Sequence, residues 1–248
     1  MRLQRETDVL PQGEITSRHV PGQRPAVVCV HGAGVSSRQN LPLLETSNGI
    51  RETWAVDLPG FGASTATEED TSVGGFADAV LSWLRVKGFT DPCLLGASMG
   101  AQVVVEAAAR APDDVGSVVL VGPTVDPQAR SWPALVGRAL LNNVAEGPSV
   151  LGSNLTDYRE AGTRRVVHSW AGSRNHRIER VLPKVNKPAL VLRGGKDVLC
   201  PQPWAEEVTR LLPYGRLVVV PGEPHAVPQT APGEALRHID DFLRKVEQ

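Results

Sequence analysis

The chain has 248 residues, of which 41% are hydrophobic and 21% are charged, and its formal net charge is −1. These values are ordinary for a globular protein and give no basis for electrostatic binding to nucleic acid or to an anionic membrane surface. No segment has the character of a signal peptide or a membrane span, and the three cysteines, Cys29, Cys93 and Cys200, have no metal-ligand spacing. We therefore expect a cytoplasmic protein with a small-molecule substrate, with no metal, cofactor, nucleic acid or membrane partner. Its oligomeric state is open.

The first half of the chain predicts strands and helices in alternation. The polar first 24 residues show the short apolar–polar alternation of an edge hairpin. Continuous apolar runs then predict buried strands, and helical periodicity predicts helices between them. The predicted strands are 25–30, 53–57, 93–95 and 115–121, and the predicted helices are 72–87 and 101–110. This order is typical of an α/β protein with a doubly wound, mostly parallel sheet.

The alternation stops after Pro123. Residues 124–186 contain no strand-like run but have helical fragments, of which 134–141 is the clearest, and many arginines. The alternation resumes with strands at 189–193 and 217–220 and helices at about 203–212 and 231–246. We therefore expect a core formed by residues 1–123 and 187–248, interrupted by a helical insertion over residues 124–186.

A Gly-x-Ser-x-Gly pentapeptide, residues 96–100, lies between a predicted strand and a predicted helix. In that context the motif predicts a tight turn in which the central residue, Ser98, has a strained backbone and an exposed hydroxyl. A side chain at Gly96 or Gly100 would collide with the neighbouring strand or helix. The amide of Met99 would point at the same spot from the helix N-terminus. Ser98 is therefore the candidate nucleophile.

Two further reactive residues follow the last two predicted strands: Asp197 after 189–193 and His225 after 217–220. Because ligands bind beyond the carboxyl ends of parallel strands, we expect both side chains to lie near Ser98. His225 can take the proton of the serine hydroxyl, and Asp197 can orient the imidazole and stabilise its cation. Asp126, after the preceding strand, is an alternative acid.

These segments together resemble the α/β-hydrolase superfamily, in its branch of serine esterases, C–C bond hydrolases and cofactor-free haloperoxidases. The resemblance is carried by residues 31–34, 57–64, 96–100, 195–197 with Pro201, and His225 with Pro232. It implies that the backbone amides of Ala33 and Met99 form an oxyanion hole. It also implies that residues 124–186 form a cap over the substrate pocket. The resemblance further implies supporting roles for Gly96 and Gly100 in the turn around Ser98, called the nucleophile elbow, and for His31, Gly32 and Gly34 in the loop that carries Ala33. Asp57 is expected to anchor its own loop.

We expect a hydrolase that cleaves a small carboxylic ester, lactone or thioester through an acyl-enzyme. The serine at position 98 argues against dehalogenase and epoxide-hydrolase chemistry, because family members with those activities have an aspartate at the equivalent position. Two alternatives stay open: a C–C bond hydrolase of the meta-cleavage type, and a ligand-binding, receptor-like protein that reuses the fold. Cys200 follows Asp197 by three residues, and the sequence offers no separate base that would make it a nucleophile.

The arginines of the insertion have two interpretations. They can bind an anionic group of the substrate, or they can form a solvated helical face with ion pairs to Asp157, Glu160 and Glu179, which the pattern favours. The residues concerned are Arg130, Arg138, Arg159, Arg164, Arg165, Arg174, Arg177 and Arg180, with His168, His176, Trp132 and Trp170 among them.

Overall fold

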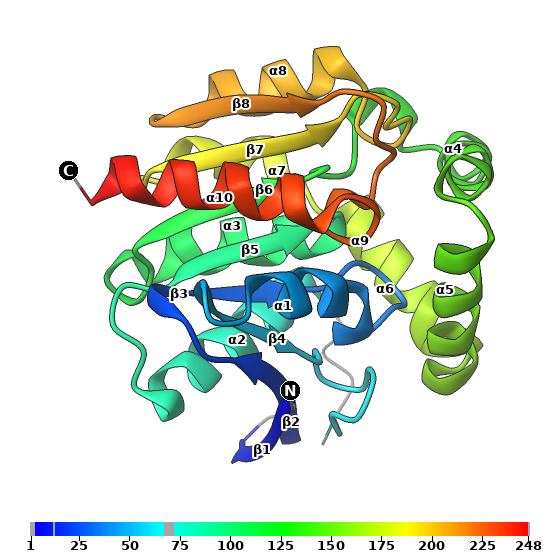
Figure 1. Cartoon of the computed structure of the whole chain (residues 1–248). Helices are drawn as coiled ribbons and strands as arrows, with labels where there is room; N and C mark the ends of the chain where they lie inside the picture. Colours follow the sequence, from blue (N-terminus) through cyan, green and yellow to red (C-terminus); the bar gives the residue numbers. More distant parts are fainter. Residues whose placement is uncertain (1–2, 12, 67–71, 248) are drawn as a thin grey trace.

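A computed structural model describes residues 3–11, 13–66 and 72–247 of the protein (Figure 1). Its centre is an eight-stranded sheet with the order β1-β2-β4-β3-β5-β6-β7-β8. The hairpin β1–β2 and the pair β2–β4 are antiparallel, and all other neighbouring strands are parallel. The predicted doubly wound, mostly parallel sheet with an edge hairpin is thus confirmed. The strands are β1 Gln4–Leu10, β2 Gly13–Val20, β3 Gln23–Val30, β4 Arg51–Val56, β5 Cys93–Ala97, β6 Ser117–Val121, β7 Ala189–Gly194 and β8 Gly215–Val220.

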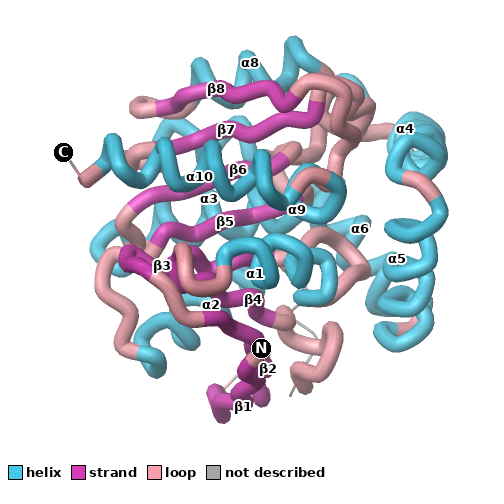
Figure 2. Tube along the Cα trace, in the orientation of Figure 1, coloured by secondary structure: helices cyan, strands magenta, loops and turns pink. Residues whose placement is uncertain are grey.

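Helices cover both faces of the sheet (Figure 2). Successive side chains of a strand point to opposite faces, so the continuous apolar run of β3 supplies two cores. Val28 and Val30 belong to one core, and Val27 and Cys29 belong to the other. The first core is closed by α2 (Val73–Lys87), α3 (Met99–Arg110) and α8 (Gln202–Leu211), the second by α1 (Leu41–Ser47), α9 (Val227–Thr230) and α10 (Pro232–Val246).

The ends of α2 show how local sequence sets the helix boundaries. The hydroxyl oxygen of Ser72 accepts the N–H of Gly75, which satisfies one of the unpaired amides of the first turn. At the other end Gly88 has φ +67°, a left-handed conformation that terminates helices and favours glycine. Most of the apolar residues between them are buried in the core, whereas Val86 is exposed.

Residues 124–186 form four α-helices: α4 (Trp132–Glu146), α5 (Pro148–Ala161), α6 (Thr163–Asn175) and α7 (Ile178–Val181). Gly147 and Gly162, with φ +83° and +80°, make the turns between the first three. Figure 1 shows α4 and α5 standing beyond the arrowheads of β5 to β8, at the carboxyl ends of these strands. Ile178 of α7 is fully buried in the core. Within the described ranges, no helix has both the length and the apolar character needed to cross a membrane.

Candidate active site

Ser98 lies in a tight turn between β5 and α3. Its φ of +57° and ψ of −116° are unusual for a residue with a side chain, and its N–H donates to the carbonyl of Val121 at 2.9 Å. A β-carbon on Gly96 would lie 2.2 Å from the carbonyl oxygen of Gly100, and one on Gly100 would lie 2.3 Å from that of Val30. Both glycines are therefore required by close backbone approach, as their spacing predicts.

His225 and Asp197 meet beyond the ends of β8 and β7. Nδ1 of the imidazole lies 2.7 Å from Oδ2 of the carboxylate, and the two residues are only 6% and 2% exposed. The other carboxylate oxygen accepts the backbone N–H groups of Leu199 and Cys200, both at 2.8 Å. These bonds fix the orientation of the carboxylate, which in turn fixes the imidazole.

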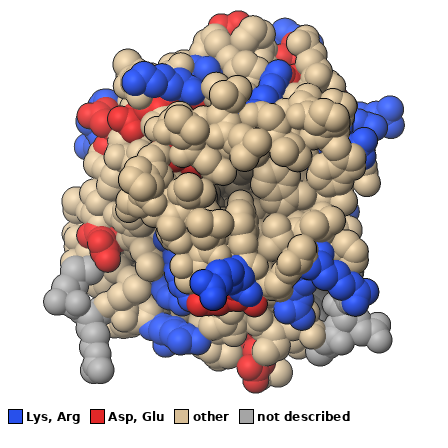
Figure 3. Space-filling view, turned by 90° about the vertical axis from the view of Figure 1, so that its right-hand side faces the viewer, with Lys and Arg blue, Asp and Glu red and all other residues tan. Residues whose placement is uncertain are grey.

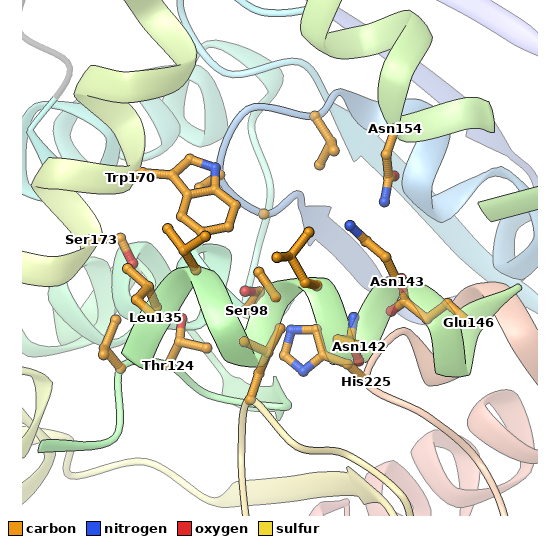
Figure 4. Close-up of a pocket in the computed structure, with 18 of the residues that line it drawn as sticks. Ser98, Thr124, Leu135, Asn142, Asn143, Glu146, Asn154, Trp170, Ser173 and His225 are labelled. Carbon is orange, nitrogen blue, oxygen red and sulfur yellow. The ribbon is translucent and has the colours of Figure 1, made fainter. Parts of the chain in front are cut away.

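The opposite nitrogen of His225, Nε2, has no hydrogen-bond partner in the described part of the chain, although it is buried. The His225 side chain lines the same cavity as Ser98 (Figure 4). Burial by itself would lower the pKa of His225, but the charge of Asp197 and its hydrogen bond, with a contribution from Glu146, raise the pKa above its ordinary value. The site thus holds a histidine with one nitrogen anchored and one nitrogen available beside a serine.

Asp126, the alternative acid, is not in contact with His225. Its carboxylate accepts the backbone N–H of Gln128 at 3.0 Å and forms an ion pair with Arg138 at 2.7 Å. The structure therefore brings Asp197, not Asp126, to the imidazole.

His31 supports the loop beside Ser98. The N–H of Leu58 donates to Nε2 at 3.0 Å, so the hydrogen is on Nδ1, which donates to the carbonyl of Gly32 at 2.8 Å. Complete burial lowers the pKa of His31, whereas the hydrogen bond to Gly32 raises it by a smaller amount. The net effect favours the neutral imidazole. Gly32 also donates its N–H to the side-chain oxygen of Gln39 at 2.9 Å. His31 is thus engaged on both ring nitrogens.

Three more of the predicted residues lie around this loop. Ala33 and Gly32 line the cavity together with Ser98. Gly34 has φ +79°, and a β-carbon there would lie 2.7 Å from the ring of Tyr158 on α5. Met99 is the first residue of α3, directly after the serine.

Asp57 anchors the loop that follows β4. Its carboxylate accepts the N–H groups of Ser37 at 2.7 Å and Ala63 at 3.0 Å and forms an ion pair with Arg18 at 3.2 Å. Burial opposes the charge of Asp57, but these bonds and the nearby His31 lower its pKa. Asp57 does not line the cavity at Ser98, in agreement with the expected structural role.

The cavity at Ser98 has a volume of about 250 Å³. Most of its wall comes from α4, α5 and α6. The sequence predicts helices in this region but does not indicate which of their residues face the cavity. The apolar part includes Leu135, Val136, Ala139, Leu140, Tyr158 and Trp170, and the polar part includes Asn142, Asn143, Glu146 and Asn154. Figure 3 shows the hollow on this face, surrounded mainly by residues other than Lys, Arg, Asp and Glu. Among the described lining residues there is no Lys or Arg.

Several arginines of residues 124–186 make contacts away from the cavity at Ser98. Arg130 forms an ion pair with Glu179 at 2.6 Å, as the sequence suggests. Arg174 donates to the carbonyl of Arg130 at 2.6 Å and lies over the ring of Trp132. Asp157 and Glu160, in contrast, both pair with a residue outside the insertion, Arg38, at 2.6 and 2.7 Å. The observed pairs favour the ion-pair interpretation over an anion-binding clamp.

Cys200 is fully buried, and burial, followed by the charge of Asp197, raises the pKa of its thiol well above the ordinary value. A nucleophilic cysteine needs the thiolate form, which this surrounding disfavours.

Comparisons with known proteins agree with this architecture. The model of the Alpha/beta hydrolase family matches residues 27–239. The chain is 29% identical over 243 residues to the biotin biosynthesis bifunctional protein BioHC of Cellvibrio japonicus, covering 88% of this chain and 47% of BioHC. It therefore spans about half the length of that relative.

A second relative is the pimeloyl-[acyl-carrier protein] methyl ester esterase of Neisseria meningitidis serogroup A, 27% identical over 84% of this chain and 73% of that protein. The crystal structure of E-2-(acetamidomethylene)succinate hydrolase superposes with a TM-score of 0.83 at 22% identity, over 98% of this chain and 100% of that one. The resemblance inferred from the motifs is confirmed: the chain belongs to the alpha/beta hydrolase family.

Proposed function

We propose that the protein is a serine hydrolase that cleaves a small carboxylic ester, lactone or thioester through an acyl-enzyme. The observation that carries the proposal is the 2.7 Å contact between His225 and Asp197, with Nε2 of the same imidazole unpaired, among the described residues, at a cavity shared with Ser98. This is the set of groups that nucleophilic acyl transfer needs: a nucleophile, a base, and an acid that orients the base.

In the proposed reaction, Oγ of Ser98 attacks the carbonyl carbon while Nε2 of His225 takes the hydroxyl proton. Asp197 stabilises the resulting imidazolium. The negative oxygen of the tetrahedral intermediate accepts the backbone N–H groups of Ala33 and Met99, each worth about 3 kcal/mol of barrier lowering by analogy with other oxyanion holes. The intermediate collapses, and His225 returns the proton to the departing alcohol or thiol.

Deacylation repeats these steps with water as the nucleophile. His225 takes a proton from the water as its oxygen attacks the acyl carbon, and then gives that proton back to Ser98 as the ester bond breaks. The carboxylic acid is released and the serine is regenerated. The two half-reactions together consume the substrate and one water molecule.

The helices of residues 124–186 act as the cap in this proposal. They supply most of the apolar wall of a cavity of about 250 Å³, a size that suits a short substrate rather than a long acyl chain. The named methyl ester esterase among the relatives supports ester chemistry. The structural similarity to a hydrolase of an acetamidomethylene compound shows the fold alone.

The test is turnover of p-nitrophenyl esters from acetate to octanoate by the wild type, by Ser98→Ala, and by Ser149→Ala. Ser149 is an exposed serine of α5 and serves as the matched control. We expect multiple turnovers by the wild type and the control, fastest with the short esters, and a loss of about 10³-fold or more in Ser98→Ala.

A wild type no faster than the uncatalysed reaction, or a Ser98→Ala variant as active as the control, would reject the proposal. Release of one equivalent of nitrophenol followed by very slow turnover would instead favour the receptor-like alternative. Inactivity on esters with turnover of a vinylogous diketone would favour the C–C bond hydrolase.

A further inference from the structure

The cavity at Ser98 is polar at one end. Asn142, Asn143 and Glu146 project from the last turns of α4, and Asn154 projects from α5; we call these four residues the acceptor corner. Figure 4 shows Asn142, Asn143 and Glu146 on one side of Ser98, with Trp170 and Ser173 on the other. In the same view the Asn154 amide points toward Asn143. Ser98 and the acceptor corner thus line one cavity, in which a bound substrate can contact both.

Glu146 gives the corner a negative charge. Its Oε1 accepts the backbone N–H of Ala226, the residue after His225, at 3.1 Å. No Lys or Arg of residues 3–11, 13–66 and 72–247 forms an ion pair with Glu146. Among the described lining residues, the only other groups that titrate as an acid or a base are His225 and Tyr158. Apart from His225, whose pKa Glu146 helps to raise, this half-buried carboxylate has no cationic partner among the described residues, whereas charges removed from water are normally paired.

Asn142 supplies an independent observation. The residue is 4% exposed, lines the cavity, and its buried side-chain oxygen has no hydrogen-bond partner among the described residues. Leaving such an oxygen unsatisfied costs about 1–3 kcal/mol, so an unpaired buried acceptor in a cavity indicates a ligand that brings a donor. Asn142 and Glu146 are four residues apart on α4 and so share one face of the helix.

We propose that the acceptor corner binds a primary ammonium group, and that the substrates of this enzyme are small esters or lactones that carry one. The inference rests on the proposed function, because it concerns the substrate that Ser98 attacks. An ammonium has three N–H donors and no acceptor, which matches the carboxylate of Glu146 and the unpaired amide oxygen of Asn142.

The other two polar classes fit the corner less well. A hydroxyl can donate one hydrogen bond but does not neutralise Glu146. A carboxylate is repelled by Glu146 and finds no Lys or Arg among the described lining residues. This preference is the opposite of an anion-binding clamp, which is the less favoured interpretation of the arginines of residues 124–186.

The probes are butylammonium, butan-1-ol and butyrate, which have the same chain and differ in the terminal group. Their inhibition constants are measured at pH 7 and constant ionic strength against p-nitrophenyl acetate hydrolysis by the wild type, Glu146→Gln and Glu45→Gln. The Glu146→Gln substitution keeps an oxygen acceptor for the N–H of Ala226 but removes the charge. Glu45 is an exposed residue of α1, and its replacement changes the net charge equally.

In the wild type and in Glu45→Gln we expect butylammonium to inhibit most strongly and butyrate most weakly, with about a tenfold preference for butylammonium over butan-1-ol. Glu146→Gln should remove most of this preference. Added NaCl should weaken inhibition by butylammonium but not by butan-1-ol in the wild type, a result that needs no variant. Equal inhibition by the three probes, or a preference for butylammonium that survives in Glu146→Gln, would overturn the proposal.

Ligand-observed NMR of the same probes with Ser98→Ala separates this inference from the proposed function, because binding there needs no turnover. Selective binding of butylammonium to Ser98→Ala, lost in Ser98→Ala/Glu146→Gln, supports the corner even if the wild type hydrolyses no ester. Butyrate binding as tightly as butylammonium in this experiment overturns it even if the wild type is an active esterase.

Discussion

Gly122 and His225 are packed directly against each other at the carboxyl end of β6. A β-carbon on Gly122 would lie 2.6 Å from Nδ1 of His225 and 2.8 Å from Oδ2 of Asp197. The glycine also has φ +50°, and its N–H donates to the carbonyl of Leu192 at 2.9 Å. The backbone of Gly122 therefore packs directly against the His225 and Asp197 side chains. Any residue with a β-carbon at position 122 would clash with them.

Replacing Gly122 by alanine is expected to displace His225 or Asp197. We expect kcat for p-nitrophenyl acetate to fall about 100-fold, since small displacements of catalytic groups have effects of that size. The matched control is Gly49→Ala, because Gly49 also has a positive φ, of 74°, but has no atom within 4 Å of its β-carbon position. Backbone strain should cost both variants about 1 kcal/mol of unfolding free energy, and the clash with His225 and Asp197 should add to the loss in Gly122→Ala, as urea denaturation would measure. Normal kcat in Gly122→Ala would show that the pair does not act in the reaction.

Asp197 and Asp126 differ sharply in what their removal should do. In Asp197→Asn the imidazole loses its charged partner and the correct tautomer is no longer enforced, so kcat should fall by about 10²–10⁴-fold. In Asp126→Asn only the ion pair with Arg138 is lost, and kcat should stay within a few-fold of the wild type. Steady-state kinetics of both variants decides the assignment, and a larger loss in Asp126→Asn would reverse it.

Much of this architecture could be predicted from the sequence because its signals are local. Strands buried on both faces, such as β3, are continuous apolar runs, and Ser98 and Asp197 each follow one. His225 follows the apolar run of the edge strand β8, in which only Val220 is buried. Boundaries were less accurate: β5 extends to Ala97, and β6 begins at Ser117. The helix α1 was missed, since seven residues with a proline near the start show too little periodicity.

The cavity wall could not be predicted, because it depends on how helices far apart in sequence dock. Asn142 and Glu146 are polar residues on α4, and pattern alone places such residues toward water. Their position at Ser98 depends on tertiary contacts such as the pairing of Arg38 with Asp157 on α5, across 119 positions of the chain. No local pattern encodes such a pair.

The raised pKa of His225 predicts the pH dependence of activity. As a base the imidazole must be neutral, so kcat/KM for p-nitrophenyl acetate should fall as the pH drops, with a midpoint above the ordinary histidine value of about 6.5. Asp197→Asn should move the midpoint down, since burial, which lowers the pKa of His225, is then opposed only weakly. Rates measured between pH 5 and 9 test this, and a midpoint below 6.5 in the wild type would contradict it.

The raised pKa of His225 also predicts how the stability of the protein depends on pH, and here lower pH is favourable. Because the folded protein binds this proton more tightly than the unfolded chain, protonated His225 stabilises the fold. This stabilisation is complete at pH values below the pKa of His225 in the unfolded chain. It is lost as the pH rises through the higher pKa that His225 has in the folded protein. Unfolding free energies of the wild type and His225→Phe should therefore differ in their pH dependence over this window. Parallel curves would show that the pKa of His225 is not raised in the folded state.

His31 provides a contrasting prediction, because it is a buried histidine that should act through structure alone. His31→Leu leaves the N–H of Leu58 and the carbonyl of Gly32 without their partner, at a cost of about 1–3 kcal/mol for each buried group. The loop that carries Ala33 should then be held less firmly, so kcat should fall about tenfold while KM changes little, as expected when an interaction of the transition state is weakened. The pH midpoint of kcat/KM should stay where it is in the wild type, since His31 is not the group that titrates. A shifted midpoint in His31→Leu, with Asp197→Asn leaving the midpoint unmoved, would identify His31 rather than His225 as the base.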